Sequence, residues 1–209
     1  MTRVKICGIT NLEDALVAAD AGADAVGFIF AESPRRVSVA QAASICRQLP
    51  PFVARVGVFV NAPTEEIRAV AAEVGLTAIQ LSGDEPPEDA AALAPIPVLK
   101  AFRVRDEAVL ERLAEYAVHA VLLDGYAPAL YGGTGVRVPV AIAHSAAERG
   151  LRVVVAGGLD PDNVAEVVSA ARPYGVDVGS GVEAHPGRKD SASIRAFIAA
   201  VREADGRPS

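Results

Sequence analysis

Short, nearly continuous apolar runs alternate with Ala-rich amphipathic stretches from one end of the chain to the other. Apolar and polar residues do not alternate with a strict period of two in these runs, which is typical of parallel strands that are covered on both faces. We predict strands over residues 3–7, 25–30, 54–60, 78–81, 98–102, 120–124, 152–156 and 176–179. We predict helices over residues 12–20, 39–48, 64–74, 87–93, 107–116, 138–149, 161–171 and 191–204.

Local signals at the helix ends support these boundaries. Asn11 is followed three residues later by Asp14, which resembles a capping box. Asp160 before Pro161 predicts an N-cap with proline in the first turn. Three glycines stand where a helix is expected to end, namely Gly22, Gly75 and Gly150.

Eight βα units in 209 residues predict an α/β fold, a (β/α)8 TIM barrel at the small end of its size range. The rival is an open, doubly wound sheet, which would carry a GxGxxG phosphate turn after its first strand. That position reads "CGIT", and the glycine-rich turns come late instead. Because no linker or shift in composition divides the chain, we predict a single domain over residues 1–209.

The composition argues against several classes of partner. Hydrophobic residues make up 51% of the chain, enough for a substantial core, and the net charge of −6 without a basic run argues against nucleic acid. Two cysteines outside any CxxC pair and three scattered histidines predict neither a disulfide framework nor a metal site. The N-terminus lacks the apolar region of a signal peptide, and no apolar run approaches the ~20 residues that span a bilayer. We therefore expect a soluble, reduced, cytoplasmic protein without a membrane partner.

Two glycine-rich loops fall at the ends of the last two strands, on the face where barrels of this kind carry their catalytic residues. "VAGGLDPDNV" places Gly157 and Gly158 after the seventh strand, and "VDVGSGVEAHPG" places Ser180 and Gly181 after the eighth, before a short helical turn. The backbone N–H groups of such loops bind phosphate without a basic side chain. Either loop alone could be only a tight turn, but together they predict a phosphorylated small-molecule ligand.

The first and sixth predicted strands each end in a reactive group. Cys7 can serve as a general base if its neighbours lower its pKa, whereas Cys46 inside an amphipathic helix fits a small buried residue. Asp124 ends the run "AVLLD" and can serve as a general acid if burial raises its pKa. The alternatives are a buried structural thiol and an aspartate that caps a turn. A base and an acid on opposite sides of one mouth would suit isomerisation by proton transfer.

Arg35 and Arg36 in "ESPRRVS" come nearest to a cationic clamp. The planar guanidinium can hold a carboxylate through two parallel hydrogen bonds. We expect one of the two to take that role and the other to be a solvated loop charge.

Nine segments between Lys5 and Asp190 resemble phosphoribosylanthranilate isomerase, in the order of that family. They read "KICGIT", "DAVGFIF", "SPRRVS", "RVGVFVN", "IQLSGDE", "LLD", "YGGTG", "VAGGLDPDNV" and "GVDVGSGVEAHPGRKD". The resemblance implies an Amadori rearrangement in tryptophan biosynthesis, without cofactor or metal. It would convert N-(5-phosphoribosyl)anthranilate to 1-(2-carboxyphenylamino)-1-deoxyribulose 5-phosphate in a monomer or a homodimer.

The resemblance also implies roles for the residues at matching positions. Cys7 would be the general base and Asp124 the general acid. Arg35 would face the anthranilate carboxylate, and Asp177 would lie near the base. The phosphate would lie on Gly157, Gly158, Ser180 and Gly181, with help from Gly133 in the sixth loop.

Two departures from the family pattern concern the support of the substrate. Ser82 stands where the family usually has histidine, which predicts weaker contact at the fourth strand end. "VRVPVAIAHS" follows "YGGTG" where the family continues with lysine and an "FDW"-like segment, so the sixth helix is expected to start differently.

Two other functions stay open. A phosphosugar isomerase barrel of histidine biosynthesis would carry aspartates at the ends of strands one and five, where this chain has Cys7 and residues 102–103. A non-catalytic phosphate-ligand-binding barrel would have the phosphate-binding loops but would not catalyse a reaction. Ser82 and the altered sixth helix support this alternative. The presence of Cys7, Asp124 and Arg35 together favours catalysis.

Overall fold

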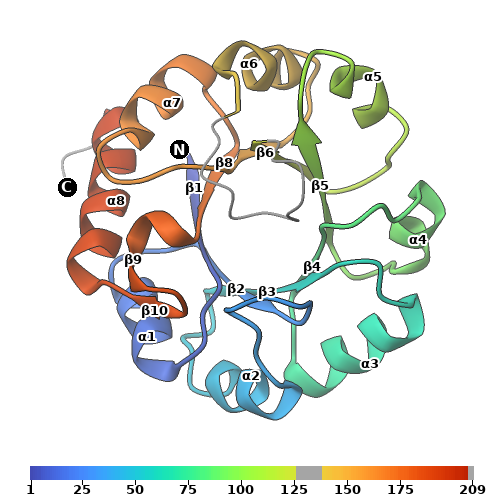
Figure 1. The fold of residues 1–209 in the computed structure, drawn as a ribbon, viewed down its shortest axis with the longest axis vertical. Helices are drawn as coiled ribbons and strands as arrows, with labels where there is room; N and C mark the ends of the chain where they lie inside the picture. The colour runs from blue at the N-terminus through green and yellow to red at the C-terminus, as the bar shows by residue number, and fades with distance from the viewer. Residues whose placement is uncertain (126–137, 207–209) are drawn as a thin grey trace.

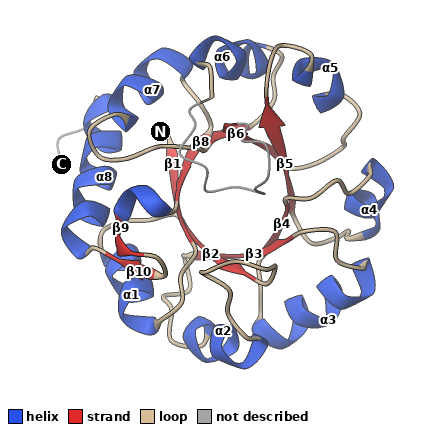
Figure 2. Cartoon of the chain, viewed as in Figure 1, coloured by secondary structure: helices blue, strands red, loops and turns tan. Residues whose placement is uncertain are grey.

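Within residues 1–125 and 138–206, which the computed structural model describes, eight parallel strands close into a ring inside an outer ring of helices (Figure 1, Figure 2). The strands are β1 (Arg3–Cys7), β2 (Ala25–Ile29), β3 (Ala54–Phe59), β4 (Ala78–Leu81), β5 (Val98–Val104), β6 (Ala120–Gly125), β7 (Val153–Val155) and β8 (Gly175–Val178). Their spatial order follows the chain, and β8 pairs with β1. The predicted (β/α)8 TIM barrel is confirmed.

The helices follow the strands one by one. They are α1 (Leu12–Asp20), α2 (Val39–Cys46), α3 (Thr64–Val74), α4 (Pro87–Ala92), α5 (Val109–Leu113), α6 (Val140–Glu148), α7 (Val164–Ala171) and α8 (Ser191–Ala204). After β8 the chain makes the predicted short helical turn, η1 (Ser180–Val182). A small hairpin of β9 (Glu183–His185) and β10 (Arg188–Lys189), which the sequence pattern did not predict, precedes α8.

The outer core lies between the barrel and the helices. Helix α8 shows how the sequence pattern produces this core, because the residues at i, i+3, i+4 and i+7 lie on one face and are all buried, namely Ile194, Phe197, Ile198 and Val201. Each such side chain contributes about 1.5–3 kcal/mol when it is fully buried. No helix of the described residues is both long enough and apolar enough to cross a membrane.

The helix ends confirm most of the local signals. The Asn11 side chain accepts a hydrogen bond from the Asp14 N–H at the start of α1, as predicted. Gly75 ends α3 in the left-handed conformation, with a φ of 74°. Such a φ favours glycine, because it lacks the Cβ that makes the conformation costly for other residues.

The predicted start of the seventh helix is wrong. Helix α7 begins at Val164, and its N-cap is Asn163 rather than Asp160. The Asp160 carboxylate accepts the backbone N–H groups of Asp162 and Asn163, at 2.9 and 3.0 Å, and so closes a separate turn around Pro161.

The fifth helix is shorter than predicted, with five residues in α5. Tyr116, which was expected inside it, instead packs edge-on against Phe102, with 5.2 Å between ring centroids. Its hydroxyl donates to the Glu85 carbonyl at 2.9 Å. These contacts lie toward α4 and the barrel. Tertiary packing therefore ends the helix earlier than the sequence propensity predicts.

Candidate active site

The carboxyl ends of the barrel strands surround a cavity of about 430 Å³. The candidates Cys7, Arg35, Ser82, Asp124, Gly157, Gly158, Asp177, Ser180 and Gly181 line it, together with Ser33, Gln80 and Arg103 at other strand ends. Gly133 lies outside the described residues. Barrel closure therefore brings together residues from seven of the eight βα units.

Two further residues that follow strands, Asn61 and the candidate Arg36, are not part of that lining. Asn61 has a left-handed backbone, with a φ of 52°, and its side-chain oxygen accepts the Asp84 N–H at 2.7 Å. It shapes the turn after β4 rather than the cavity. Arg36 forms an isolated backbone bridge with Ile29, so only Arg35 of the arginine pair lines the cavity.

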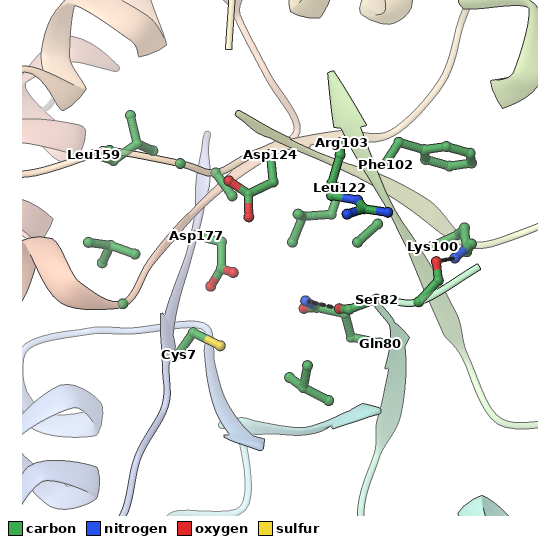
Figure 3. A pocket seen from close by; sticks show the side chains of 18 of the residues that line it. Cys7, Gln80, Ser82, Lys100, Phe102, Arg103, Leu122, Asp124, Leu159 and Asp177 are labelled. Carbon is green, nitrogen blue, oxygen red and sulfur yellow. Dashed lines mark hydrogen bonds between the residues drawn. The ribbon is translucent and has the colours of Figure 1, made fainter. Parts of the chain in front are cut away.

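Asp124 and Cys7 both point into the cavity, from β6 and β1 (Figure 3). Burial, and then the negative charge of Asp177, raises the pKa of the Asp124 carboxyl to about 6. One of its oxygens, Oδ1, is buried and has no hydrogen-bond partner among the described residues. A carboxyl in this state can carry a proton near neutral pH and deliver it to a ligand.

The Cys7 thiol is buried at the end of β1. Burial raises its pKa, while the nearby Lys5 ammonium opposes that rise. Both groups lie over Gly27 of the neighbouring strand, where a Cβ atom would come within 2.9 Å of the Cys7 sulfur and 3.1 Å of the Lys5 Nζ. Glycine at this position therefore leaves the room in which the thiol and the ammonium sit together.

Lys5 was missed as a functional candidate, because a lysine in an opening strand reads as an exposed charge with an aliphatic stem. Its Nζ is 2.9 Å from Asp177 Oδ1, and both side chains are buried. Burial alone would lower the pKa of Lys5, but Asp177 and Cys7 outweigh it and hold that pKa above its ordinary value. The signal that could have found it is the spacing of two from Cys7, which places both on one face of the strand.

The glycine-rich loops after β7 and β8 lie against each other. Gly157 and Gly158 both have a left-handed φ, 86° and 62°, which glycine adopts without the steric cost of a Cβ atom. A Cβ atom on Gly181 would come within 1.8 Å of the Leu159 carbonyl oxygen. The two loops can approach this closely only with glycine at position 181.

Arg35 reaches the cavity from the loop after β2 and is held by Glu183 of β9. Its Nε and Nη2 atoms each donate to a Glu183 oxygen at 2.8 Å. The Lys189 Nζ lies 3.0 Å from the same carboxylate and also donates to the Gly179 carbonyl at 2.8 Å. Burial would raise the pKa of Glu183, but the Arg35 hydrogen bond and the Lys189 charge hold it below its usual value. Two cations against one carboxylate leave one net positive charge at this wall.

The structure supplies the partners of Arg35 that the sequence did not indicate. Glu183 and Lys189 belong to the "GVEAHPGRKD" segment, whose family pattern gave no individual role to either residue. The described residues contain no group of three or more His, Cys, Asp or Glu that could hold a metal ion.

Comparison with known proteins identifies the family of this chain. Residues 4–200 match the family model of N-(5'phosphoribosyl)anthranilate (PRA) isomerase. The N-(5'-phosphoribosyl)anthranilate isomerase of Pelobacter propionicus is 53% identical over 204 residues, which are 97% of each chain.

Two solved structures share the fold over the same length. One shows monomers generated from the dimeric phosphoribosylanthranilate isomerase of Thermotoga maritima, with a TM-score of 0.88 and 43% identity over 97% of this chain and 100% of that one. Another is a phosphoribosyl anthranilate isomerase in complex with reduced 1-(o-carboxyphenylamino)-1-deoxyribulose 5-phosphate. It has a TM-score of 0.87 and 44% identity, and it covers 97% of this chain and 100% of that one.

Proposed function

Because the chain belongs to the N-(5'-phosphoribosyl)anthranilate isomerase family, we propose that it converts N-(5-phosphoribosyl)anthranilate to 1-(2-carboxyphenylamino)-1-deoxyribulose 5-phosphate in tryptophan biosynthesis. The observation that carries the proposal is the pair of Cys7 and Asp124 in one cavity, with a carboxyl whose pKa is raised to about 6. The relative that holds a reduced product analogue supports a phosphorylated substrate of this kind.

In the first step, Asp124 gives its proton to the ring oxygen of the ribose as the C1′–O bond breaks. The nitrogen lone pair forms a C1′=N bond, so the open chain is a protonated Schiff base and Asp124 becomes a carboxylate. The Gly125 N–H and the Lys5 charge stabilise that carboxylate, because both lower its pKa.

In the second step, the Cys7 thiolate removes the proton from C2′. The C–H electron pair forms a C1′=C2′ bond and the C1′=N pair returns to nitrogen, which gives an enolamine. Transfer of the hydroxyl proton from O2′ to C1′ then gives the ketone. C2′ is oxidised and C1′ is reduced by the same two electrons, so the balance needs no external oxidant or reductant.

We assign the two ends of the substrate to separate groups of residues at the rim. The phosphate lies on Gly157, Gly158, Ser180 and Gly181, where left-handed glycines and the start of η1 present backbone N–H groups. The anthranilate carboxylate lies on Arg35. Glu183 uses Nε and Nη2, which leaves the Nη1 and Nη2 edge of the guanidinium for a second carboxylate.

Arg35→Ala is expected to raise KM by about 30-fold and to change kcat by less than about fivefold. A charge-assisted hydrogen bond to the carboxylate exists both before and after the transition state, so its loss weakens binding uniformly. Steady-state kinetics of the purified variant measure both constants. Arg36→Ala is the matched control and should change KM by less than about threefold, and equal losses in the two variants would contradict the assignment to Arg35.

The loss of phosphoribosylanthranilate fluorescence with time tests the whole proposal. Purified enzyme with a thiol reductant present should quench it, and dialysis against EDTA should leave the rate unchanged. Binding of the substrate without turnover would favour the non-catalytic barrel instead. Light scattering after size exclusion settles the assembly, for which the dimeric Thermotoga maritima relative favours a homodimer over a monomer.

A further inference from the structure

Gln80 carries a polar atom that the proposed mechanism does not use. It lies on β4, lines the cavity and is 5% exposed. Its Nε2 donates to the Ser82 hydroxyl oxygen at 3.0 Å, whereas its Oε1 is buried and has no hydrogen-bond partner among the described residues. Figure 3 shows the amide group of Gln80 facing the side chains of Cys7, Asp177 and Asp124 across the cavity.

A buried acceptor without a donor lowers stability, because folding removes it from water and gives it nothing in exchange. Two such oxygens, counted over residues 1–125 and 138–206, line this cavity, Gln80 Oε1 and Asp124 Oδ1. The proposed reaction gives Asp124 a partner in the ring oxygen of the substrate. Gln80 requires a donor, since a carbonyl oxygen can only accept.

The geometry restricts which donor of the substrate can reach Gln80. The proposed mechanism puts Cys7 beside C2′ and Asp124 beside the ring oxygen, and Gln80 faces both of these side chains (Figure 3). On that arrangement we infer that β4 faces the substituents of C1′ and C2′. Those substituents carry two donors, the amine N–H and the C2′ hydroxyl. The amine stands ortho to the anthranilate carboxylate and can donate to it in a six-membered ring. The C3′ hydroxyl lies one carbon nearer the phosphate, on the side where β8 presents Asp177.

Resting on the proposed function, we propose that Gln80 is a substrate-binding residue whose Oε1 accepts a hydrogen bond from the C2′ hydroxyl. This bond fixes the rotation about C2′ and directs the C2′ hydrogen toward Cys7. A neutral amide suits the position, because a third carboxylate beside Asp124 and Asp177 would repel both and the thiolate. It also gives specificity, since a ligand without this hydroxyl leaves a buried oxygen unpaired.

The test compares two ligands on three proteins. The ligands are reduced 1-(o-carboxyphenylamino)-1-deoxyribulose 5-phosphate and its counterpart without the C2 hydroxyl, with dissociation constants from calorimetry. Wild type should prefer the hydroxylated ligand by about 30-fold, within the range for a buried acceptor that loses its donor. Gln80→Met removes the acceptor at similar size and should reduce the preference to less than about threefold. Ser82→Ala is the matched control and should keep a preference above about tenfold.

The outcomes separate this inference from the proposed function. If Gln80→Met keeps the wild-type preference for the hydroxylated ligand, the inference is overturned. Gln80→Leu also lacks an acceptor, so it must lose the preference as Gln80→Met does. A third ligand with an ether oxygen in place of the amine tests the other donor. If Gln80→Met abolishes the preference for amine over ether instead, the hydroxyl assignment is wrong. Turnover by wild type is measured separately, and its absence would count against the proposed function alone.

Discussion

Cys7→Ser is expected to lower kcat/KM for phosphoribosylanthranilate by about 10³- to 10⁴-fold. The serine hydroxyl keeps the shape of the thiol but is far too weak an acid to supply an anionic base, and general-base catalysis is worth about 10²–10⁴-fold. Lys5, whose Nζ shares the space over Gly27 with the sulfur, can stabilise a thiolate but cannot make an alkoxide common at neutral pH. The fluorescence assay under reductant measures the loss.

Cys46→Ser is the matched control for this variant. Cys46 is the other free cysteine, is buried in α2 and is not among the residues that line the cavity. Its replacement should change kcat/KM by less than about threefold and should lower the stability of the fold, because a buried sulfur becomes a hydroxyl. Retention of more than a tenth of the wild-type rate by Cys7→Ser would remove Cys7 from the role of base.

Asp124→Asn is expected to lower kcat by about 10²- to 10⁴-fold, because the amide has the same shape but does not protonate the ring oxygen. KM should change much less, since the phosphate and carboxylate contacts are on other walls. Single-turnover kinetics at saturating substrate measure the chemical step. Asp20→Asn, at the exposed end of α1, is the matched control and should leave kcat unchanged.

Asp124→Asn should also stabilise the folded protein above pH 6. The pKa of Asp124 is raised from 3.8 to about 6, so its contribution to stability is fully present below pH 3.8 and is lost as the pH rises through 6. Asn avoids that loss, and we expect Asp124→Asn to be more stable than wild type by about 1–2 kcal/mol at pH 8 and by nearly nothing at pH 4. Urea unfolding at the two pH values tests this, and a variant that is less stable at pH 8 would contradict the burial of an ionised carboxylate.

The pH dependence of turnover follows from the two groups together. Asp124 must be protonated and Cys7 ionised, yet the carboxyl, with a pKa of about 6, titrates below the thiol, whose pKa burial raises. Between these two pKa values, each rise of one pH unit lowers the fraction of protonated Asp124 tenfold and raises the fraction of ionised Cys7 tenfold. The two changes cancel, so kcat/KM should stay level from pH 6.5 to 8.5. A tenfold fall per pH unit above 6 would mean that the thiolate is already formed there.

Much of the fold and part of the site could be predicted from the sequence because their signals are local. Continuous apolar runs fixed the positions of the strands, and alternation with amphipathic helices fixed the barrel. Parallel strands of a barrel end on one face, so the sequence alone places Cys7, Asp124 and the paired glycine loops around one mouth. The error at Asp160 was local, because its carboxylate accepts the N–H of Asp162 two residues later. The error at Tyr116 was not, because its hydroxyl donates to the Glu85 carbonyl 31 positions away.

Only the tertiary structure decided how these residues act on one another. Lys5 meets Asp177 across 172 positions of chain, and Arg35 meets Glu183 across 148, because barrel closure brings β8 and its following hairpin beside β1 and the loop after β2. Gln80 Oε1 has no partner in the described part of the chain for the same reason, since its partners depend on which side chains the closed ring places opposite it. The sequence by itself determined which reactive groups stand at strand ends. The pKa of each group, its ion-pair partner and its access to a ligand depend on burial and distance, which the closed barrel creates.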